Sequence, residues 1–514
     1  MWPFRYPYSN FHELNLDWIL ERVKEMSDKL ESFNDYLPRF AQVNNSIWSE
    51  EHSYKPNEMV VVNDSIYIAR TFVPAGTSVG DERFWLRVAT ITIDAEELLE
   101  QVKKALWYVT PEDFGAAHDG VTDDGAAFAA ALNSGYPVKL IRTDKRYTIK
   151  SPVIVGKSAA VLTGAAEWNE TGTGTGSGIN LSENGRFEIN NSLFHADNIY
   201  IYTYSQTSNT PVFVLNGDGL DVDAEFFNCC FSEGFNAIRC NGRGLRVENC
   251  TFARVPNCID LNFIGTTDAD DPITESKVTG GRAFEIRDNR FHSGCTYAVR
   301  IIEGSSVAEM LYTGNNSDHY GAGVAVYGTA RHLTITNNIF ANCVYRPFAV
   351  VGTVDGLVFT ENVLTSRDVA GSGLAQCLFE VVASGTLNNA TITNNLFDGS
   401  GYQAIVFRNA VAAYLNISNN EFRNINLTGD NRAYGVVDVP LDTKNFVCTG
   451  NIFVSAAPTA AGACISCVGG AANTMQRWIV QNNMKCQNKD WLVHPDIMNV
   501  IVDSLVQTYR NTPT

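Results

Sequence analysis

Carboxylate side chains are the groups in this sequence whose types and placement could do acid–base chemistry. The candidates lie in the second half of the chain, in the longer stretches between recurring apolar residues. General acids, bases and nucleophiles must meet in space, and they leave no local motif when neighbouring segments supply them. We therefore predict the catalytic candidates by position alone, as Asp318, Asp368 and Glu380, with Tyr320 as a candidate substrate contact. The alternative is that these groups are ordinary solvated surface residues.

A short recurring phrase indicates the elements that would position these groups. It reads Ile335-Thr336-Asn337-Asn338-Ile339-Phe340, with close copies at 286–291, 392–397 and 417–422. Degenerate copies occur at 247–252, 359–364, 447–453 and 480–484. From Phe340 onward, the terminal apolar residue recurs every 24 to 33 residues. Such a period is typical of a solenoid, whose units bury their apolar sides by stacking on one another.

Each copy of the phrase has the pattern of a β-strand that ends in a tight corner. Apolar and polar residues alternate, as in Leu333, Ile335 and then Asn337, which is the period of a strand. Asparagine tolerates left-handed backbone angles, so the Asn-Asn pair suits a corner, and stacked asparagines can form hydrogen-bonded ladders. These features predict a parallel β-helix. The Leu-x-x-Leu-x-Leu spacing of leucine-rich repeats is absent, and a β-propeller needs repeats of about 40 residues or more.

This pattern predicts that Glu380 lies on the outer side of its strand. Phe379 and Val381 flank it and are expected to face the core. The comparable strand of the previous coil is Phe348-Ala349-Val350, so Ala349 is expected beside Glu380.

The overall charge argues against nucleic acid as a partner. The chain has 514 residues, 38 basic and 56 acidic, with a net charge of −18 and no basic stripe. No apolar run reaches the ~18 residues of a membrane span, and Met1-Trp2-Pro3-Phe4 does not begin a secretory signal. We therefore expect no nucleic acid, no membrane insertion and synthesis in a cytoplasm.

All twelve cysteines lie after residue 228, several at repeat positions. Disulfides are one possibility for an even number of cysteines. In the reducing cytoplasm that we expect, cysteines stay free, so most of them are expected to serve as small buried hydrophobic residues. The Cys464-x-x-Cys467 pair has no second pair nearby, so we expect neither a zinc site nor another cofactor.

The first hundred residues have the pattern of a stem. A heptad seam runs through Leu16, Ile19, Val23, Met26, Leu30, Phe33, Leu37 and Phe40, and a shorter one through Ile91, Ala95, Leu98, Val102 and Ala105. An amphipathic helix on a globular core is the alternative for the first seam. Between the seams, residues 46–90 read as a small β-rich module with a turn at Asn63-Asp64-Ser65.

The spacing of this module resembles that of small carbohydrate-binding modules of chitinases. The resemblance implies that Tyr67 and Trp85 stack on sugar rings. The alternative is that both aromatics form the core of a short spacer.

The phrase Asp113-Phe114-Gly115-Ala116 followed by Asp119-Gly120-Val121-Thr122-Asp123-Asp124 resembles the lead-in of pectate-lyase-like β-helix proteins, a family with many bacteriophage tailspikes. Thr122 or Asp123 is expected to cap a helix whose Phe128, Ala131 and Leu132 cover the open end of the solenoid. We expect Asp119, Asp123 and Asp124 to be turn and cap residues and not catalytic or metal-binding ones. The expected fold is mainly β, a right-handed parallel β-helix (pectate-lyase-like) preceded by a coiled-coil stem with a small β module.

The segment Asn10-Phe11-His12-Glu13-Leu14-Asn15-Leu16-Asp17-Trp18 resembles the start of appendage proteins from short-tailed phages. The expected domains are a virion-docking segment and coiled coil (1–45), the β module (46–90), a second coiled coil (91–109), the β-helix (110–505) and a tail (506–514). Nothing after about residue 505 reads as a trimerisation domain, so oligomerisation would rest on the stem and the solenoid flanks.

The two resemblances imply a homotrimeric tail appendage of the virion, made in the host cytoplasm. Its partners would be phage tail or collar proteins at the N-terminus and a host surface glycan. The implied function is to bind and depolymerise that polysaccharide, by hydrolysis or lyase chemistry. A non-enzymatic adhesin is the main alternative, and a secreted pectate-lyase-like enzyme is a weaker one.

Overall fold

A computed structural model places most of the chain in β-strands. It describes residues 48–56, 58–62, 65–90, 108–141, 144–156, 159–165, 167–168, 174–175, 178–190, 193–206, 210–216, 221–263, 284–318, 322–343, 346–366, 377–408, 410–425, 436–440, 443–454, 463–467, 478–484, 491–493 and 507–508. The docking segment and both expected coiled coils lie outside these residues. The chain divides into two compact units, Met1–Leu106 and Trp107–Thr514.

The first unit contains a small antiparallel sheet. Its strands are β1 (Met59–Val62), β2 (Ser65–Ala69) and β3 (Trp85–Thr90), in the order β1-β2-β3. The β1 and β2 strands pair on either side of residues 63–64, where the sequence predicts a turn. Trp85 is 2% exposed and packs with Tyr54, Val60, Ala69 and Val73, so the sheet closes over one small core.

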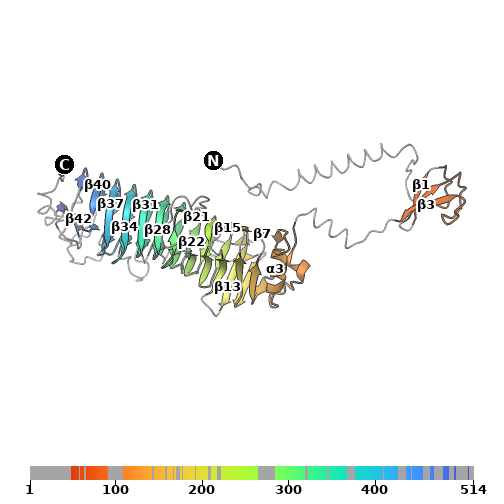
Figure 1. The fold of residues 1–514 in the computed structure, drawn as a ribbon, viewed down its shortest axis with the longest axis horizontal. Coiled ribbons are helices and arrows are strands. Elements are labelled where there is room, and N and C mark those ends of the chain that lie inside the picture. Colours follow the sequence, from red (N-terminus) through yellow and green to blue (C-terminus); the bar gives the residue numbers. More distant parts are fainter. Residues whose placement is uncertain are drawn as a thin grey trace, which may run out of the picture. The chain divides into compact units, whose positions relative to one another are not determined.

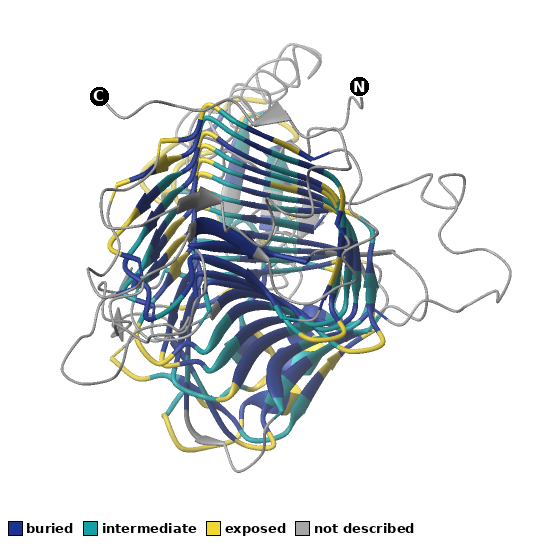
Figure 2. Cartoon of the chain, turned by 90° about the vertical axis from the view of Figure 1, so that its left-hand side faces the viewer, coloured by how far each residue is buried: buried dark blue, intermediate teal, exposed yellow. Residues whose placement is uncertain are grey.

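The second unit is a parallel β-helix made of three long sheets (Figure 1). Each coil contributes one strand to each sheet, as in β28, β29 and β30, before the chain returns to the first sheet at β31. We name each sheet by its first strand: the β4, β5 and β6 sheets. Figure 2 shows the coils stacked with buried residues along all three sheets. This confirms the solenoid predicted from the repeat.

The β4 sheet has fourteen strands on its main path, with β24 (Ser306–Val307) paired to β28 at its side. The strands are β4 (Val138–Lys139), β7 (Ala159–Thr163), β12 (Leu193–Asp197), β15 (Asp221–Phe227), β18 (Arg243–Glu248), β21 (Phe284–Arg287), β25 (Met310–Thr313), β28 (Thr329–Thr336), β31 (Thr353–Thr360), β34 (Thr386–Thr393), β37 (Val411–Ser418), β40 (Lys444–Thr449), β43 (Ile479–Gln481) and β45 (Gln507–Thr508).

The other two sheets are made of shorter strands. The β5 sheet contains β5 (Tyr147–Ile149), β10 (Gly178–Glu183), β13 (Tyr200–Gln206), β16 (Cys230–Ser232), β19 (Thr251–Ala253), β22 (Arg290–Phe291), β26 (Asn316–Asp318), β29 (Ile339–Ala341), β32 (Val363–Thr365), β35 (Leu396–Asp398), β38 (Glu421–Arg423) and β41 (Ile452–Phe453). The β6 sheet contains β6 (Pro152–Val155), β11 (Arg186–Asn190), β14 (Pro211–Asn216), β17 (Asn236–Cys240), β20 (Asn257–Leu261), β23 (Tyr297–Ile301), β27 (Ala322–Val326), β30 (Phe348–Val350), β33 (Phe379–Val381), β36 (Ile405–Phe407), β39 (Val437–Val439), β42 (Ala463–Cys467) and β44 (Trp491–Val493). A small hairpin, β8 (Glu167–Trp168) with β9 (Gly174–Thr175), lies apart from these sheets.

The two residues of the Asn-Asn pair have different tasks at the corner between the β4 and β5 sheets. The first adopts the left-handed conformation, as at Asn337 and Asn394, with φ of 57° and 58°. The second is buried, and its Nδ2 donates to the Oδ1 of the equivalent residue one coil further on, at 2.9 to 3.1 Å. This confirms the predicted ladder, whose members are Asn289, Asn315, Asn338, Asn362, Asn395, Asn420, Asn451 and Asn483.

Aromatic rings continue the same register inside the solenoid. Phe231, Phe252 and Phe291 stack in succession with ring centroids 4.9 and 5.0 Å apart. Phe397, Phe422 and Phe453 repeat the arrangement further along. The apolar residue that ends the phrase therefore faces the core, as the sequence predicts, except in the copy at 480–484, where Met484 is 60% exposed. Ten cysteines of the described residues are free and buried, which agrees with their predicted use as small hydrophobic residues.

The lead-in phrase folds into a lid on the first coil. After η1 (Pro111–Phe114), the helix α3 (Gly125–Leu132) buries Phe128, Ala131 and Leu132 against the solenoid. The N-cap residue is Asp124, which corrects the prediction of Thr122 or Asp123. The Asp124 carboxylate instead accepts the backbone N–H groups of Ala117 and Thr148, which ties the lid to β5.

The neighbouring acids of the lead-in also bind backbone. Asp119 accepts the N–H groups of Val121 and Thr122 at 2.8 and 2.7 Å, and Asp123 accepts those of Gly125 and Lys150 at 3.0 and 2.9 Å. Asp119, Asp123 and Asp124 thus serve as turn and cap residues, as predicted. No helix among the described residues is long and apolar enough to cross a membrane.

Candidate functional site

Outward-facing residues of the β6 sheet form one straight row, because its strands pair in register. Successive positions hold Arg239, Asp260 and Arg300, then Ala325 and Ala349, then Glu380, Val406 and Asp438. The flanking residues in each strand, such as Phe379 and Val381, are buried in the core. The predicted pairing of Ala349 with Glu380 is confirmed.

The first group in this row is built around Asp260, whose side chain is fully buried. Arg300 donates to both of its oxygens, from Nε at 2.9 Å and from Nη2 at 2.8 Å. Arg239 approaches the same carboxylate from the other side, with Nη2 3.7 Å from Oδ2. The side chains remain partly exposed, at 34% for Arg239 and 26% for Arg300. A buried acid thus orients two arginines that reach solvent.

The second group repeats this arrangement around Glu380. Its side chain is also fully buried, and Arg408 Nε contacts Oε1 while Arg346 Nε contacts Oε2. The two arginine side chains are 40% and 41% exposed. Glu380 therefore points away from the core, as predicted, but the groups around it keep it out of contact with solvent. What a ligand would meet here is guanidinium.

Two tyrosines lie between these groups. The Tyr297 and Tyr327 hydroxyl oxygens are 2.9 Å apart, and the Arg300 guanidinium lies 5.6 Å from the centre of the Tyr297 ring. Burial, then the neighbouring Tyr327 hydroxyl, raises the pKa of Tyr297 to about 12, and the charges of Arg300 and Arg346 oppose this rise. Both groups and the two tyrosines follow one another along the β6 sheet, and we call this strip the arginine row.

The arginine row extends toward Asp438, whose buried carboxylate accepts a hydrogen bond from Gln403 Nε2 at 3.0 Å. Glu380 and Asp438 lie two strands apart in the sheet, about 10 Å between backbones. Asp260 and Glu380 lie four strands apart, about 19 Å. Only the Glu380–Asp438 separation approaches the distance between the two carboxyl groups of a glycoside hydrolase.

Of the predicted catalytic residues, Asp318 and Glu380 are described, and they lie in different sheets. Asp318 ends β26 in the β5 sheet, where its Oδ1 accepts Asn342 Nδ2 at 3.1 Å. The same Asp–Asn contact between neighbouring coils recurs at Asp398 and Asn424, so this position serves a corner of the coil. Glu380 belongs to the β6 sheet, and Asp368 and Tyr320 lie outside the described residues.

The aromatic residues of the first unit differ in accessibility. The Trp85 ring lies in the core, 5.2 Å from the Tyr54 ring, which favours the spacer alternative over stacking on a sugar. Tyr67 is half-buried against the same core.

Sequence reasoning missed Arg239, Asp260, Arg300, Arg346 and Arg408. A signal for three of them was present, because each stands between two core residues of a strand, as in Ile259-Asp260-Leu261 and Val299-Arg300-Ile301. No such pattern marks Arg346 or Arg408, which lie just outside their strands.

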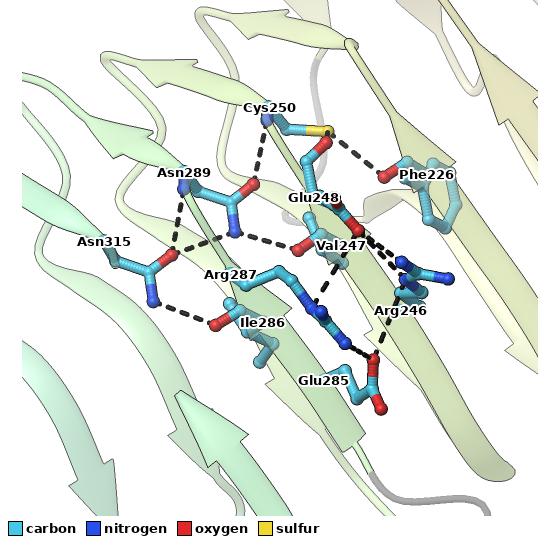
Figure 3. A network of polar contacts seen from close by, with 10 residues as sticks. All are labelled: Phe226, Arg246, Val247, Glu248, Cys250, Glu285, Ile286, Arg287, Asn289 and Asn315. Atoms are coloured by element: carbon cyan, nitrogen blue, oxygen red, sulfur yellow. Dashed lines mark hydrogen bonds and ion pairs between the residues drawn. The ribbon is translucent and has the colours of Figure 1, made fainter. Parts of the chain in front are cut away.

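A second charged cluster occupies the outer face of the β4 sheet at β18 and β21 (Figure 3). Arg246 and Arg287 alternate with Glu248 and Glu285, and each arginine contacts both acids. Its opposite charges are equal in number and all partly exposed. It therefore resembles an ordinary surface ion-pair network more than a binding site.

No family model matches the sequence, and no curated protein matches it. Among solved structures, the pre-mature gene product 12 of bacteriophage phi29 is similar, with a TM-score of 0.43 and 15% identity over 80% of this chain and 59% of that one. Tailspike protein 3 of bacteriophage CBA120 has a TM-score of 0.35 and 14% identity, covering 91% of this chain and 78% of that one.

The tailspike of phiAB6 has a TM-score of 0.29 and 14% identity over 72% of this chain and 60% of that one. It was solved with three-repeated oligosaccharides of Acinetobacter baumannii surface polysaccharide. This chain therefore spans less than two thirds of the phi29 and phiAB6 proteins. Several solved structures similar to it are tailspikes or other tail proteins of phages.

Proposed function

We propose that this protein is a phage tail appendage that binds a host cell-surface polysaccharide through the arginine row. The observation that carries the proposal is a straight strip on one sheet, in which buried acids hold arginines toward the outside and a hydrogen-bonded tyrosine pair lies between the two groups. Pre-oriented polar groups bind a ligand with a smaller loss of side-chain entropy. The lead-in phrase and the N-terminal segment support the assignment to a phage.

The direct test is binding to an array of purified bacterial envelope polysaccharides. The full-length protein is expected to bind at least one member, and Arg300→Ala with Arg408→Ala is expected to abolish that binding. Arg423→Ala is the matched control, because Arg423 is an exposed arginine, ion-paired to Glu421, on the β5 sheet. The proposal fails if no polysaccharide binds, or if the double variant binds like the control.

Depolymerisation is the second candidate function. Glu380 and Asp438 are the described carboxylates of the row whose spacing comes nearest to an acid–base pair with room for a water molecule. Their complete burial weighs against this role unless a ligand displaces the arginines. If the protein shortens the bound polymer, Glu380→Gln should abolish product formation while binding persists. Unchanged viscosity and oligosaccharide profile with the unaltered protein would leave the adhesin as the function.

We also propose that the protein assembles as a homotrimer. From β25 to β43, two neighbouring outward columns near the carboxyl ends of the β4-sheet strands hold no charged residue among those described. This uncharged face consists of Leu311, Thr334, Val358, Thr391, Asn416, Val447 and Ile479 in one column and Thr313, Thr336, Thr360, Thr393, Ser418, Thr449 and Gln481 in the other. A third outward column, nearer the start of the strands, does carry charge, at Arg331, Asp355 and Lys444. Chains of net charge −18 repel each other, so an uncharged face is where copies can pack at least cost.

A further inference from the structure

The arginine row has an excess of positive charge, and this narrows the class of polysaccharide that it can bind. Both of its groups place two guanidinium groups on one carboxylate, Arg239 and Arg300 on Asp260 and Arg346 and Arg408 on Glu380. Each group therefore carries one excess positive charge. In a chain of net charge −18, this excess is opposite to the overall field.

Because the carboxylates are buried, the excess of positive charge is stronger at the surface than the charge count alone suggests. The two carboxylates are fully buried, whereas the four arginine side chains are between 26% and 41% exposed. A guanidinium has five N–H donors and no acceptor, so it keeps donors that the buried acid does not use. Arg239 Nε is itself buried, and the partly exposed side chains bring other such donors to the surface. An approaching ligand thus meets donors and positive charge, and the compensating negative charge lies beneath them.

The ligand group that fits such donors is a carboxylate or a phosphate. Planar guanidinium groups bind both with paired, charge-assisted hydrogen bonds, which are about twice as strong as neutral ones. The carboxylates below hold the arginines in place before the ligand arrives, as the two contacts of Arg300 with Asp260 show. A neutral sugar hydroxyl would accept hydrogen bonds from the same donors, but these bonds would be weaker.

The separation of the groups indicates a polymer and not a single small anion. Asp260 and Glu380 lie about 19 Å apart along the row, with Ala325, Ala349 and the Tyr297–Tyr327 pair between them. Aromatic rings provide flat apolar surface on which sugar rings can lie. An extended chain that carries acidic groups at intervals would contact the first group, the tyrosines and the second group in turn.

Building on the proposed function, we infer that the polysaccharide bound by the arginine row is acidic, with carboxylate or phosphate groups that recur along the chain. The same solenoid also has a cluster without an excess of positive charge. In that cluster, two arginines are balanced by two acids: Arg246, Glu248, Glu285 and Arg287. Positive excess is therefore a property of the row and not of arginine-containing surfaces on this protein in general.

The test uses the full-length protein and an array that contains acidic and neutral bacterial polysaccharides. The bound members should be acidic. Each should bind at least about tenfold more weakly after its carboxyl groups are reduced to alcohols or its phosphates are removed, because charge-assisted bonds are lost. Arg300→Gln and Arg408→Gln should each weaken binding about tenfold or more, and Arg423→Gln should not. Binding should also fall steeply with added salt.

The outcomes separate this inference from the proposed function. Binding to neutral members, or equal binding before and after removal of the acidic groups, would overturn the acidic class and leave polysaccharide binding intact. Binding to no member at all would overturn the proposed function itself, and this inference with it. Far-UV circular dichroism and thermal midpoints close to those of the unaltered protein will show that the glutamine variants are folded.

Discussion

Individual residues of the repeat have separate physical tasks, and the two asparagines of the pair show this best. Asn394 is exposed and takes the left-handed conformation, whereas Asn395 is buried and joins the ladder. Asn395 Oδ1 accepts from the backbone N–H and the Nδ2 of Asn362, and its own Nδ2 donates to Phe359 O and Asn420 Oδ1. The same residue type therefore serves backbone geometry in one position and buried hydrogen bonding in the next.

Asn395→Ala is expected to destabilise the solenoid by about 3 kcal/mol, because it leaves buried donors of Asn362 without an acceptor. Chemical unfolding of the full chain will measure this loss. Asn394→Gly is the matched control and should be nearly neutral, because glycine adopts the left-handed conformation readily. Asn394→Val should lower the free energy of unfolding by about 1–2 kcal/mol, because valine adopts the left-handed conformation only with steric strain. Similar losses for the alanine and glycine variants would contradict the division of tasks.

Asp119 gives the lid a predictable response to acid. Hydrogen bonds from the backbone N–H groups of Thr122 and Val121 lower the pKa of its carboxyl group to about 2. Since the folded-state pKa lies below the usual value near 3.9, the stabilisation is complete above that value and is lost as the pH falls toward 2.

The thermal midpoint of Asp119→Ala should therefore lie below that of the unaltered protein at pH 5. The difference should shrink between about pH 4 and pH 2. Differential scanning calorimetry across this range measures it. A difference that stays constant down to pH 2 would show that the carboxylate does not contribute through its charge.

At the scale of elements, the repeat predicts strands well because each strand is dictated locally. Alternation sets which residues are buried, and the Asn-Asn pair ends the strand, so the register of Ala349 with Glu380 follows from aligning two copies. The lid helix follows from its apolar residues, although its cap is Asp124 and not the predicted Thr122 or Asp123.

The candidate site was less predictable because its contacts depend on the paths of loops. Arg346 reaches Glu380 from the segment before β30, and Arg408 from the residue after β36. Loop lengths vary between coils, so spacing in the sequence does not indicate which arginine meets which acid. Burial of Glu380 was missed for the same reason, since the strand pattern shows only that it points outward.

At the scale of the whole molecule, the solenoid divides its tasks among its faces. The β6 sheet carries the arginine row, whereas two outward columns of the β4 sheet change from charged to uncharged between β21 and β25. In the preceding coils the same two columns hold the Arg246 network (Figure 3). One face is thus suited to a ligand and another to a neighbouring copy.

The division into two compact units gives a prediction about attachment. Deletion of residues 1–45 should leave a folded solenoid, because the core of Trp107–Thr514 is formed within that unit. The truncated protein should keep its circular dichroism spectrum and polysaccharide binding but fail to join phage particles in a reconstitution assay. Incorporation at the level of the full chain would show that docking lies elsewhere.

The uncharged face gives the last prediction, which concerns assembly. The unaltered protein should sediment at three times the 56.5 kDa of one chain. Val358 is 42% exposed near the middle of that face, so glutamate at this position can stay solvated in a single chain. In the trimer, Val358→Glu would bury an unpaired charge in an interface between acidic copies, and this should favour dissociation.

Ile154→Glu is the matched control, because Ile154 is an aliphatic residue 51% exposed on the β6 sheet. Sedimentation velocity should show a lower mean mass for Val358→Glu and no change for Ile154→Glu. If Val358→Glu keeps the mass of the unaltered protein, the copies do not meet through this face. If the unaltered protein sediments as one chain, the trimer itself is wrong, while binding by the arginine row, which needs only one chain, can still be correct.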